Sequence, residues 1–168
     1  TGVNNQPNAP RGFAPRGETP VIKQMSKRFG SSVMSAVSNR GSARWMVYQG
    51  ALHSARLIKF MARLCKQAGG RKVVLILDNL RVHHSAPVKE WLAEHAAAIA
   101  VHHLPSYSPE LNPNEMANAD LKQAVTKLAP ARTKLQLVKA TSRHLRSVQR
   151  QPERIKSYFQ HEPVRYAA

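Results

Sequence analysis

Acidic side chains are scarce in this chain, so any chemistry that needs a carboxylate depends on very few positions. The 168 residues include 26 Lys and Arg residues but only nine Asp and Glu residues. Two of the nine occupy positions that suit a reactive group: Asp78 ends an apolar run, and Glu115 lies at the start of a predicted helix. The full set is Asp78, Asp120, Glu18, Glu90, Glu94, Glu110, Glu115, Glu153 and Glu162.

Asp78 closes the run VVLILD, which extends from Val73. A continuous apolar run after a helix predicts a central strand buried on both faces. In open α/β sheets, ligands bind beyond the carboxyl ends of the strands, and an acid placed there leaves the core while its backbone stays rigid. The alternative is a purely structural role, since Asp often caps the turn that follows a strand.

Glu115 has a structural explanation as well. Asn112-Pro113-Asn114-Glu115 matches a capping box, with Asn112 at the N-cap and Glu115 reaching back to a backbone N–H. Pro113 then starts a helix that we expect to run to about Leu128. A carboxylate in the first turn is also favoured by the helix dipole.

The same helix allows a functional interpretation of Glu115. At about 100° per residue, Asn118, Lys122 and Thr126 share its face, which makes a polar surface suited to a phosphate backbone. Asp120 lies about 140° away from Glu115 around the helix and is a poorer partner.

Other reactive side chains give weaker patterns. The histidines suggest zinc, but adjacent residues on a strand point to opposite faces, so only one of each pair could converge, and no cysteine accompanies them. Cys65 lies on the apolar side of a predicted helix, which disfavours a nucleophilic role. The histidines concerned are His83, His84, His102 and His103.

The elements that must position the acids alternate along the chain. After loop-like residues 1–20, the sequence predicts a β-hairpin over 32–38 and 43–49, a helix over 53–68 stopped by two glycines, and the strand ending at Asp78. A helix capped by Ser85, a strand over 99–104, the Pro113 helix and a helix over 131–150 follow. This order implies parallel strand pairing with helices on the faces, and therefore a mixed α/β sheet.

The net charge of +17 favours a polyanionic partner, and nucleic acid is the first choice. A basic protein without a nucleic-acid role and a ribosomal-type binder are the alternatives. Two predicted helices carry basic stripes, for which a solvated face is the simpler explanation. These stripes are Arg56, Lys59, Arg63 and Lys66, and Lys139, Arg143, Arg146 and Arg150.

Several properties bound the setting of the protein. The length suits one domain, and the single cysteine excludes an internal disulfide, so we expect a reducing, cytoplasmic setting. No apolar run approaches the roughly 20 residues that span a bilayer, so no membrane partner is expected. The absence of a starting methionine suggests a fragment or a processed product.

The two acidic segments together resemble the catalytic core of bacterial, mariner-type insertion-sequence transposases of the DDE superfamily. The matching motifs are Asp78-Asn79 with His83, and SPELNPNE, which ends at Glu115. The acids are separated by 36 residues, close to the separation in that family. The resemblance implies a ribonuclease-H-like mixed sheet with flanking helices over residues 1–129, and a helical extension, 130–168, packed on that core.

The resemblance also implies site roles and partners. Asp78 and Glu115 would be catalytic and metal-binding, with Asn79, His83 and Lys122 in supporting or DNA-contacting roles. The cofactor would be two Mg or Mn ions, and the reaction metal-dependent DNA strand cleavage and strand transfer. The partners would be transposon ends and target DNA, bound by a homodimer of the full-length protein.

The start of the chain also matches the family, and it marks a departure from it. Thr1-Gly2 and residues 11–20 resemble the segment after the family's first strand, so the first catalytic Asp and the N-terminal DNA-binding region would lie upstream of residue 1. The isolated chain would then be inactive, and a non-catalytic basic nucleic-acid-binding protein is the alternative. Residues 116–119 depart from the family too, because relatives usually carry an aromatic residue there.

Overall fold

The computed structural model describes residues 1–5, 15–17, 28–127 and 131–168, and the side chains of 126 and 127 are not described. Most of the opening motif over residues 11–20, and the side chain of Thr126, therefore lie outside the described residues. The elements in chain order are β1 Gly2–Asn4, β2 Gly30–Val37, β3 Ala43–Tyr48, α1 Ser54–Gln67, β4 Val73–Leu77, η1 Arg81–His84, α2 Ala86–Glu94, β5 Ile99–His103, η2 Pro109–Leu111, α3 Pro113–Lys127, α4 Lys134–Gln149, α5 Pro152–Ser157 and η3 Glu162–Ala167.

The first sheet is antiparallel and has the order β1-β2-β3. The predicted hairpin is confirmed, since β2 pairs with β3 from Ser32↔Tyr48 to Val37↔Ala43. The expectation that residues 1–20 form only loop is wrong for β1, where Gly2 pairs with Ser32. A strand of three residues is too short to show a periodic pattern, and its partner strand is what stabilises it.

The second sheet consists of β4 and β5, which run parallel as the order of elements predicts. Within the described residues the strands form two separate sheets, one antiparallel and one parallel, so both kinds of pairing in the predicted mixed α/β arrangement are present. The expectation that β4 is buried on both faces is wrong, because Val74 is 65% exposed. Val73 and Leu75 pack towards α1 and α2, whereas Val74 points to a face that no helix of the described residues covers.

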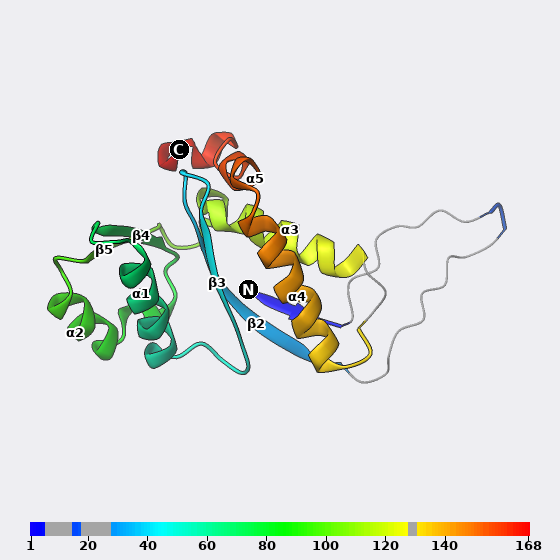
Figure 1. The fold of residues 1–168 in the computed structure, drawn as a ribbon, viewed down its shortest axis with the longest axis horizontal. Helices are drawn as coiled ribbons and strands as arrows, with labels where there is room; N and C mark the ends of the chain where they lie inside the picture. The colour runs from blue at the N-terminus through cyan, green and yellow to red at the C-terminus, as the bar shows by residue number, and fades with distance from the viewer. Residues whose placement is uncertain (6–14, 18–27, 128–130) are drawn as a thin grey trace.

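Each of the two sheets is covered by its own pair of helices. Helices α1 and α2 pack on β4 and β5 through a core that includes Leu57, Met61, Val88 and Ile99. Helices α3 and α4 pack on the antiparallel sheet, as Figure 1 shows. The two faces of β2 contact different helix pairs. Val33 belongs to the core formed with α3 and α4, and the next residue, Met34, packs against the core of α1 and α2.

The predicted helices are confirmed, with one correction. Helix α1 ends before Gly69, whose φ of 61° is a left-handed conformation that glycine adopts without strain. Ser85 precedes α2 at the N-cap position, but its side chain does not cap the helix, because its hydroxyl donates to the Val82 carbonyl at 2.8 Å. The predicted apolar face of α4 is buried at Leu137, Thr141, Leu145 and Val148.

The predicted basic stripe of α4 is exposed at all four of its positions, and α1 exposes three of its four. Among the described residues, none of the helices combines the length and apolar character that crossing a bilayer requires.

Candidate metal-binding cleft between the two sheets

A cavity of about 640 Å³ lies between β2 and β4. Residues 33–37 of β2 form one wall and residues 74–77 of β4 form the other. Asp78 and Glu115 both line it, together with Asn118 and Lys122 from α3. The two acids that stood out in the sequence therefore reach the same cavity, although 36 residues separate them.

Asp78 is held by its own turn. It directly follows β4, and its carboxylate accepts hydrogen bonds from His83 Nδ1, at 3.1 Å, and from the backbone N–H of Leu80. The hydrogen bond from His83 lowers the pKa of Asp78 below its ordinary value, despite an opposing effect of burial. The turn-capping role and the functional role are thus compatible, because the capping contacts keep a half-exposed carboxylate ionised.

His83 contacts Asp78 through both the carboxylate and the backbone carbonyl of Asp78. Its side chain is buried, at 6% exposure, and its Nδ1 also donates to the Asp78 carbonyl at 2.8 Å. Burial opposes protonation of His83, but the hydrogen bonds to Asp78 outweigh it and raise the His83 pKa. His83 therefore orients the acid rather than facing solvent.

Glu115 lies in the first turn of α3, and only half of its predicted capping box is formed. Asn112 Oδ1 accepts from the Asn114 N–H at 3.0 Å, which is the expected N-cap. The Asn112 N–H, however, donates to the Pro109 carbonyl, and Glu115 Oε1 accepts from Asn118 Nδ2 at 3.0 Å. The carboxylate of Glu115 is thus directed along the cavity side of the helix instead of back to its cap.

Thr1 connects the acids to the antiparallel sheet. Its nitrogen donates to the Val33 carbonyl at 2.7 Å, and its carbonyl accepts from the Val33 N–H at 2.8 Å. Thr1 lines the same cleft as Asp78, Glu115 and Lys122. The region of the two acids is therefore in direct contact with the edge of β2.

Asn79, His84 and His103 are not among the residues that line the cleft. Asn79 is exposed, donates to Ser106 Oγ at 2.8 Å and is in hydrogen-bond contact with His84. His84 stacks on His103 with ring centroids 4.3 Å apart. Across the residues that the structure describes, no three His, Cys, Asp or Glu side chains form a group that could hold a metal.

Cys65 and Asp120 do not belong to the cleft. Burial raises the pKa of the Cys65 thiol, and the side chain packs against the α1–α2 core. Asp120 accepts a hydrogen bond from Tyr158 Oη at 2.5 Å and forms an ion pair with Arg154 at 2.6 Å. Sequence reasoning missed this network, because Arg154 and Tyr158 lie more than 30 residues away and no local pattern links them to Asp120.

Comparison with known proteins identifies the family of this chain. The sequence profile of the DDE superfamily endonucleases matches residues 1–138. The chain belongs to the DDE superfamily endonuclease family. A search of curated protein sequences gives no significant match to this chain.

Solved structures of Mos1 transposase share the fold of this DDE-family chain. A pre-cleavage Mos1 transpososome matches with a TM-score of 0.59 and 16% identity, over 95% of this chain and 53% of that one. A Mos1 mariner paired-end complex with Mn matches with a TM-score of 0.54 and 17% identity, over 92% and 52%. The ribonuclease-H-like α/β fold is thereby confirmed, and the chain spans about half the length of these structures.

Proposed function

We propose that this chain is the catalytic domain of a DNA transposase, which cleaves and transfers DNA strands with the help of divalent cations. The observation that carries the proposal is the convergence of Asp78 and Glu115 on one cavity, in a chain of the DDE endonuclease family. Lys122, which lines the cavity, and Asn79, which is exposed next to Asp78, are suited to contact DNA phosphates there.

The chemistry of the two acids fits a hard cation. Mg²⁺ takes oxygen ligands and is commonly bound through one or two carboxylates, with water and substrate phosphate completing the shell. Asp78 and Glu115 offer two such carboxylates, each oriented by a hydrogen bond from a neighbouring side chain. When bound, a pair of such ions stabilises the attacking and leaving oxygens of a phosphoryl displacement.

A third carboxylate has an evident place in this cleft. Within the described residues, β4 pairs only with β5, and β2 has no partner on its β1 side beyond Val33. An extended segment that enters between these two edges would pair with both and reach Thr1 beside the acids. We propose that such a strand supplies a third carboxylate, and that the protein acts on transposon ends and target DNA as a homodimer in the bacterial cytoplasm.

The metal role is tested by titrating the 168-residue chain with Mn²⁺ in a calorimeter. We expect one weak site, and we expect Asp78→Asn and Glu115→Gln each to lower its affinity by about 10-fold or more. Glu90→Gln, which removes an exposed acid from α2, is the matched control and should leave the affinity unchanged. Equal Mn²⁺ binding by all four proteins would disprove a site at these acids.

The role of the third acid is tested by a DNA-nicking assay with Mg²⁺ or Mn²⁺. The chain alone should not nick DNA, because two carboxylates do not complete the two-ion site. Robust nicking that disappears in Asp78→Ala would overturn the requirement for a further acid. DNA binding without any Mn²⁺ site would instead favour the second candidate, a non-catalytic basic DNA-binding protein, for which the net charge of +17 is the supporting observation.

A further inference from the structure

The C-terminal segment, residues 152–168, contacts the region around Glu115 at two points, one on each side of it. Before Glu115, Tyr166 Oη donates to the carbonyl of Leu111 at 2.7 Å. After it, Tyr158 Oη donates to Asp120 Oδ2. The start of α3 is thus attached to the C-terminal segment both at the loop that leads into the helix and in the helix itself.

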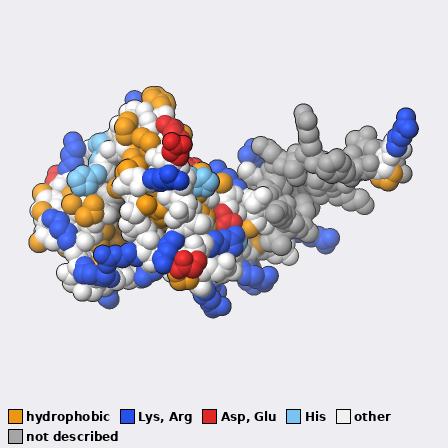
Figure 2. Space-filling view, turned by 90° about the horizontal axis from the view of Figure 1, so that it is seen from above, with side chains coloured by type: hydrophobic (Ala, Val, Ile, Leu, Met, Phe, Trp, Pro, Cys, Tyr) orange, Lys and Arg blue, Asp and Glu red, His pale blue; other side chains and the backbone are white. Residues whose placement is uncertain are grey.

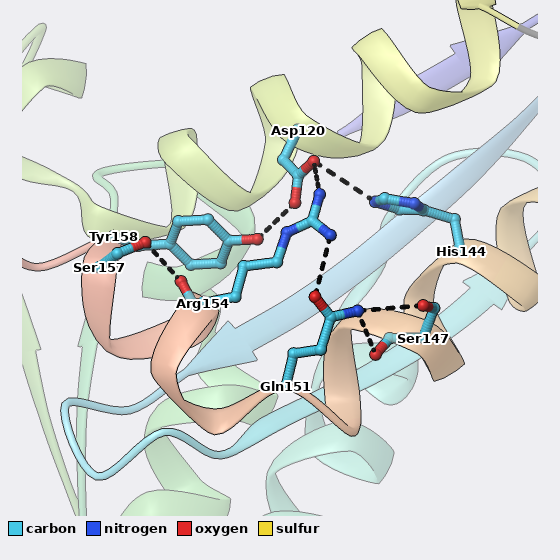
Figure 3. A network of polar contacts seen from close by, with 7 residues as sticks. All are labelled: Asp120, His144, Ser147, Gln151, Arg154, Ser157 and Tyr158. Atoms are coloured by element: carbon cyan, nitrogen blue, oxygen red, sulfur yellow. Dashed lines mark hydrogen bonds and ion pairs between the residues drawn. The ribbon is translucent and has the colours of Figure 1, made fainter.

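The contact at Asp120 is a network of hydrogen bonds and ion pairs that joins α3, α4 and the C-terminal segment (Figure 3). The Asp120 side chain is only 15% exposed and accepts from Arg154 Nη2 at 2.6 Å as well as from Tyr158. Hydrogen bonding to Asp120 raises the pKa of Arg154, and Gln151 accepts from Arg154 while donating to the Ser147 carbonyl of α4. Charge-assisted hydrogen bonds of this kind are short and directional, so they fix the rotation of α3 about its axis.

Apolar packing reinforces the two polar contacts. Met116 and Ala117, the residues directly after Glu115, pack against a buried cluster that includes Ile155, Tyr158 and Phe159. Apolar side chains at the start of α3 therefore pack directly against apolar side chains of the C-terminal segment. Phe159 also lines the cleft, so the same cluster reaches the cavity that Glu115 faces.

We propose that residues 152–168 are a positioning segment for Glu115, with Arg154, Tyr158 and Tyr166 as its anchors. The match to the DDE endonuclease family ends at residue 138, so the segment lies outside the part of the chain that the family accounts for. The proposal rests on the metal-binding role proposed for Glu115. Its physical basis is that the segment is attached both to the loop that precedes α3 and to α3 itself, through two tyrosines and a buried apolar cluster.

The test is amide hydrogen exchange on the full chain. Arg154→Met removes the ion pair to Asp120, and Tyr166→Phe removes only the hydroxyl that donates to Leu111. We expect exchange at residues 114–118 to accelerate about 10-fold in Arg154→Met, as follows from the loss of a hydrogen bond to a charged group, and less in Tyr166→Phe. Amides of β4, over 73–77, should keep their wild-type rates.

The matched control is Lys156→Met, which also removes a cation and an ion pair from α5, but one that joins Lys156 to Glu153 and not to α3. Its exchange at 114–118 should equal that of the wild type. Unchanged exchange there in both test variants would overturn the proposal, and so would uniform acceleration that includes β4, because the segment would then act only on global stability. Tyr166→Phe keeps the test valid if Arg154→Met does not fold, since Tyr166 is largely exposed.

Mn²⁺ titration of the same variants separates this proposal from the proposed function. If the wild type binds Mn²⁺, Arg154→Met should weaken binding by about 10-fold and Lys156→Met should not. A wild-type chain that binds no Mn²⁺ would contradict the metal role of Glu115, whereas the exchange rates would still decide whether the segment fixes α3.

Discussion

Asp78 and Glu115 are each oriented by residues that lie within five positions of them in the chain. His83 and the Leu80 N–H hold Asp78, and Asn118 holds Glu115. A ligand side chain whose rotamer is already fixed loses little conformational entropy when a cation binds, and its geometry is set before the cation arrives. At the scale of single residues, the two carboxylates are therefore held in place by hydrogen bonds, as the proposed metal role requires.

A residue-scale prediction concerns His144, whose ring is mostly buried beside Asp120, 3.7 Å from its carboxylate. Burial lowers the pKa of His144 below its ordinary value of 6.5. Because the unfolded chain then binds a proton that the folded chain resists, stability is complete above the unfolded pKa and is lost as pH falls from about 6.5 towards the folded pKa. His144→Gln should therefore lose less stability than the wild type between pH 7 and pH 5.

Thermal unfolding at pH 7, 6 and 5 checks this expectation. The Tm of the wild type should fall more steeply on acidification than that of His144→Gln. His161→Gln, at an exposed position, is the matched control. If the difference in Tm between His144→Gln and the wild type stays constant with pH, His144 does not contribute to the pH dependence of stability.

At the scale of elements, the β2–β3 hairpin turn is fitted against the start of α5. Gly41 has a φ of 81°, and a Cβ at this position would lie 2.8 Å from both Cβ and the carbonyl oxygen of Pro152. The turn therefore needs glycine twice, once for its left-handed backbone and once for the close approach of Pro152. This contact attaches the antiparallel sheet to the C-terminal segment.

Gly41→Ala should destabilise the fold by about 2–4 kcal/mol, the sum of left-handed strain and a clash with backbone atoms. Gly50→Ala has a similar φ of 77° with open space around it, so it should cost only about 1–2 kcal/mol. Urea unfolding of the two variants measures the difference. Equal losses would mean that the hairpin and α5 move apart at little cost.

At the scale of the whole molecule, the chain is strongly basic, although two acids line its cleft. The net charge is +17, and Figure 2 shows Lys and Arg side chains spread over the described part of one face, with few acidic side chains among them. A field of this sign attracts a polyanion, whereas Asp78 and Glu115 repel phosphates at the cleft unless a cation lies between them. The net charge would thus attract DNA to the proposed site, and a cation bound by Asp78 and Glu115 would be needed to bring a phosphate next to these acids.

The corresponding prediction is a steep salt dependence of DNA binding. If about 6–10 phosphates are contacted, the affinity should fall about 10³–10⁵-fold between 50 and 200 mM salt. Fluorescence anisotropy with a labelled duplex measures this slope, and it should be preserved in Asp78→Asn when no divalent metal is present. A flat response to salt would contradict a DNA partner.

The sequence by itself determined the elements whose signals are local. The apolar face of α4, the α1 stop at Gly69, the β2–β3 hairpin and the placement of Asp78 after a strand all follow from spacing within about 20 residues, which backbone geometry translates directly into structure. The pair Asp78 and Glu115 was also found from the sequence, because its motifs surround both acids.

Only the tertiary structure decided the features that depend on distant partners. The pairing of β1, the exposure of Val74, the separation into two sheets and the Asp120–Arg154–Tyr158 network each require knowing which segments meet in space. A three-residue strand or a single buried carboxylate has no periodicity of its own. Its conformation and its free energy come from contacts with residues remote in the chain, which no local pattern specifies.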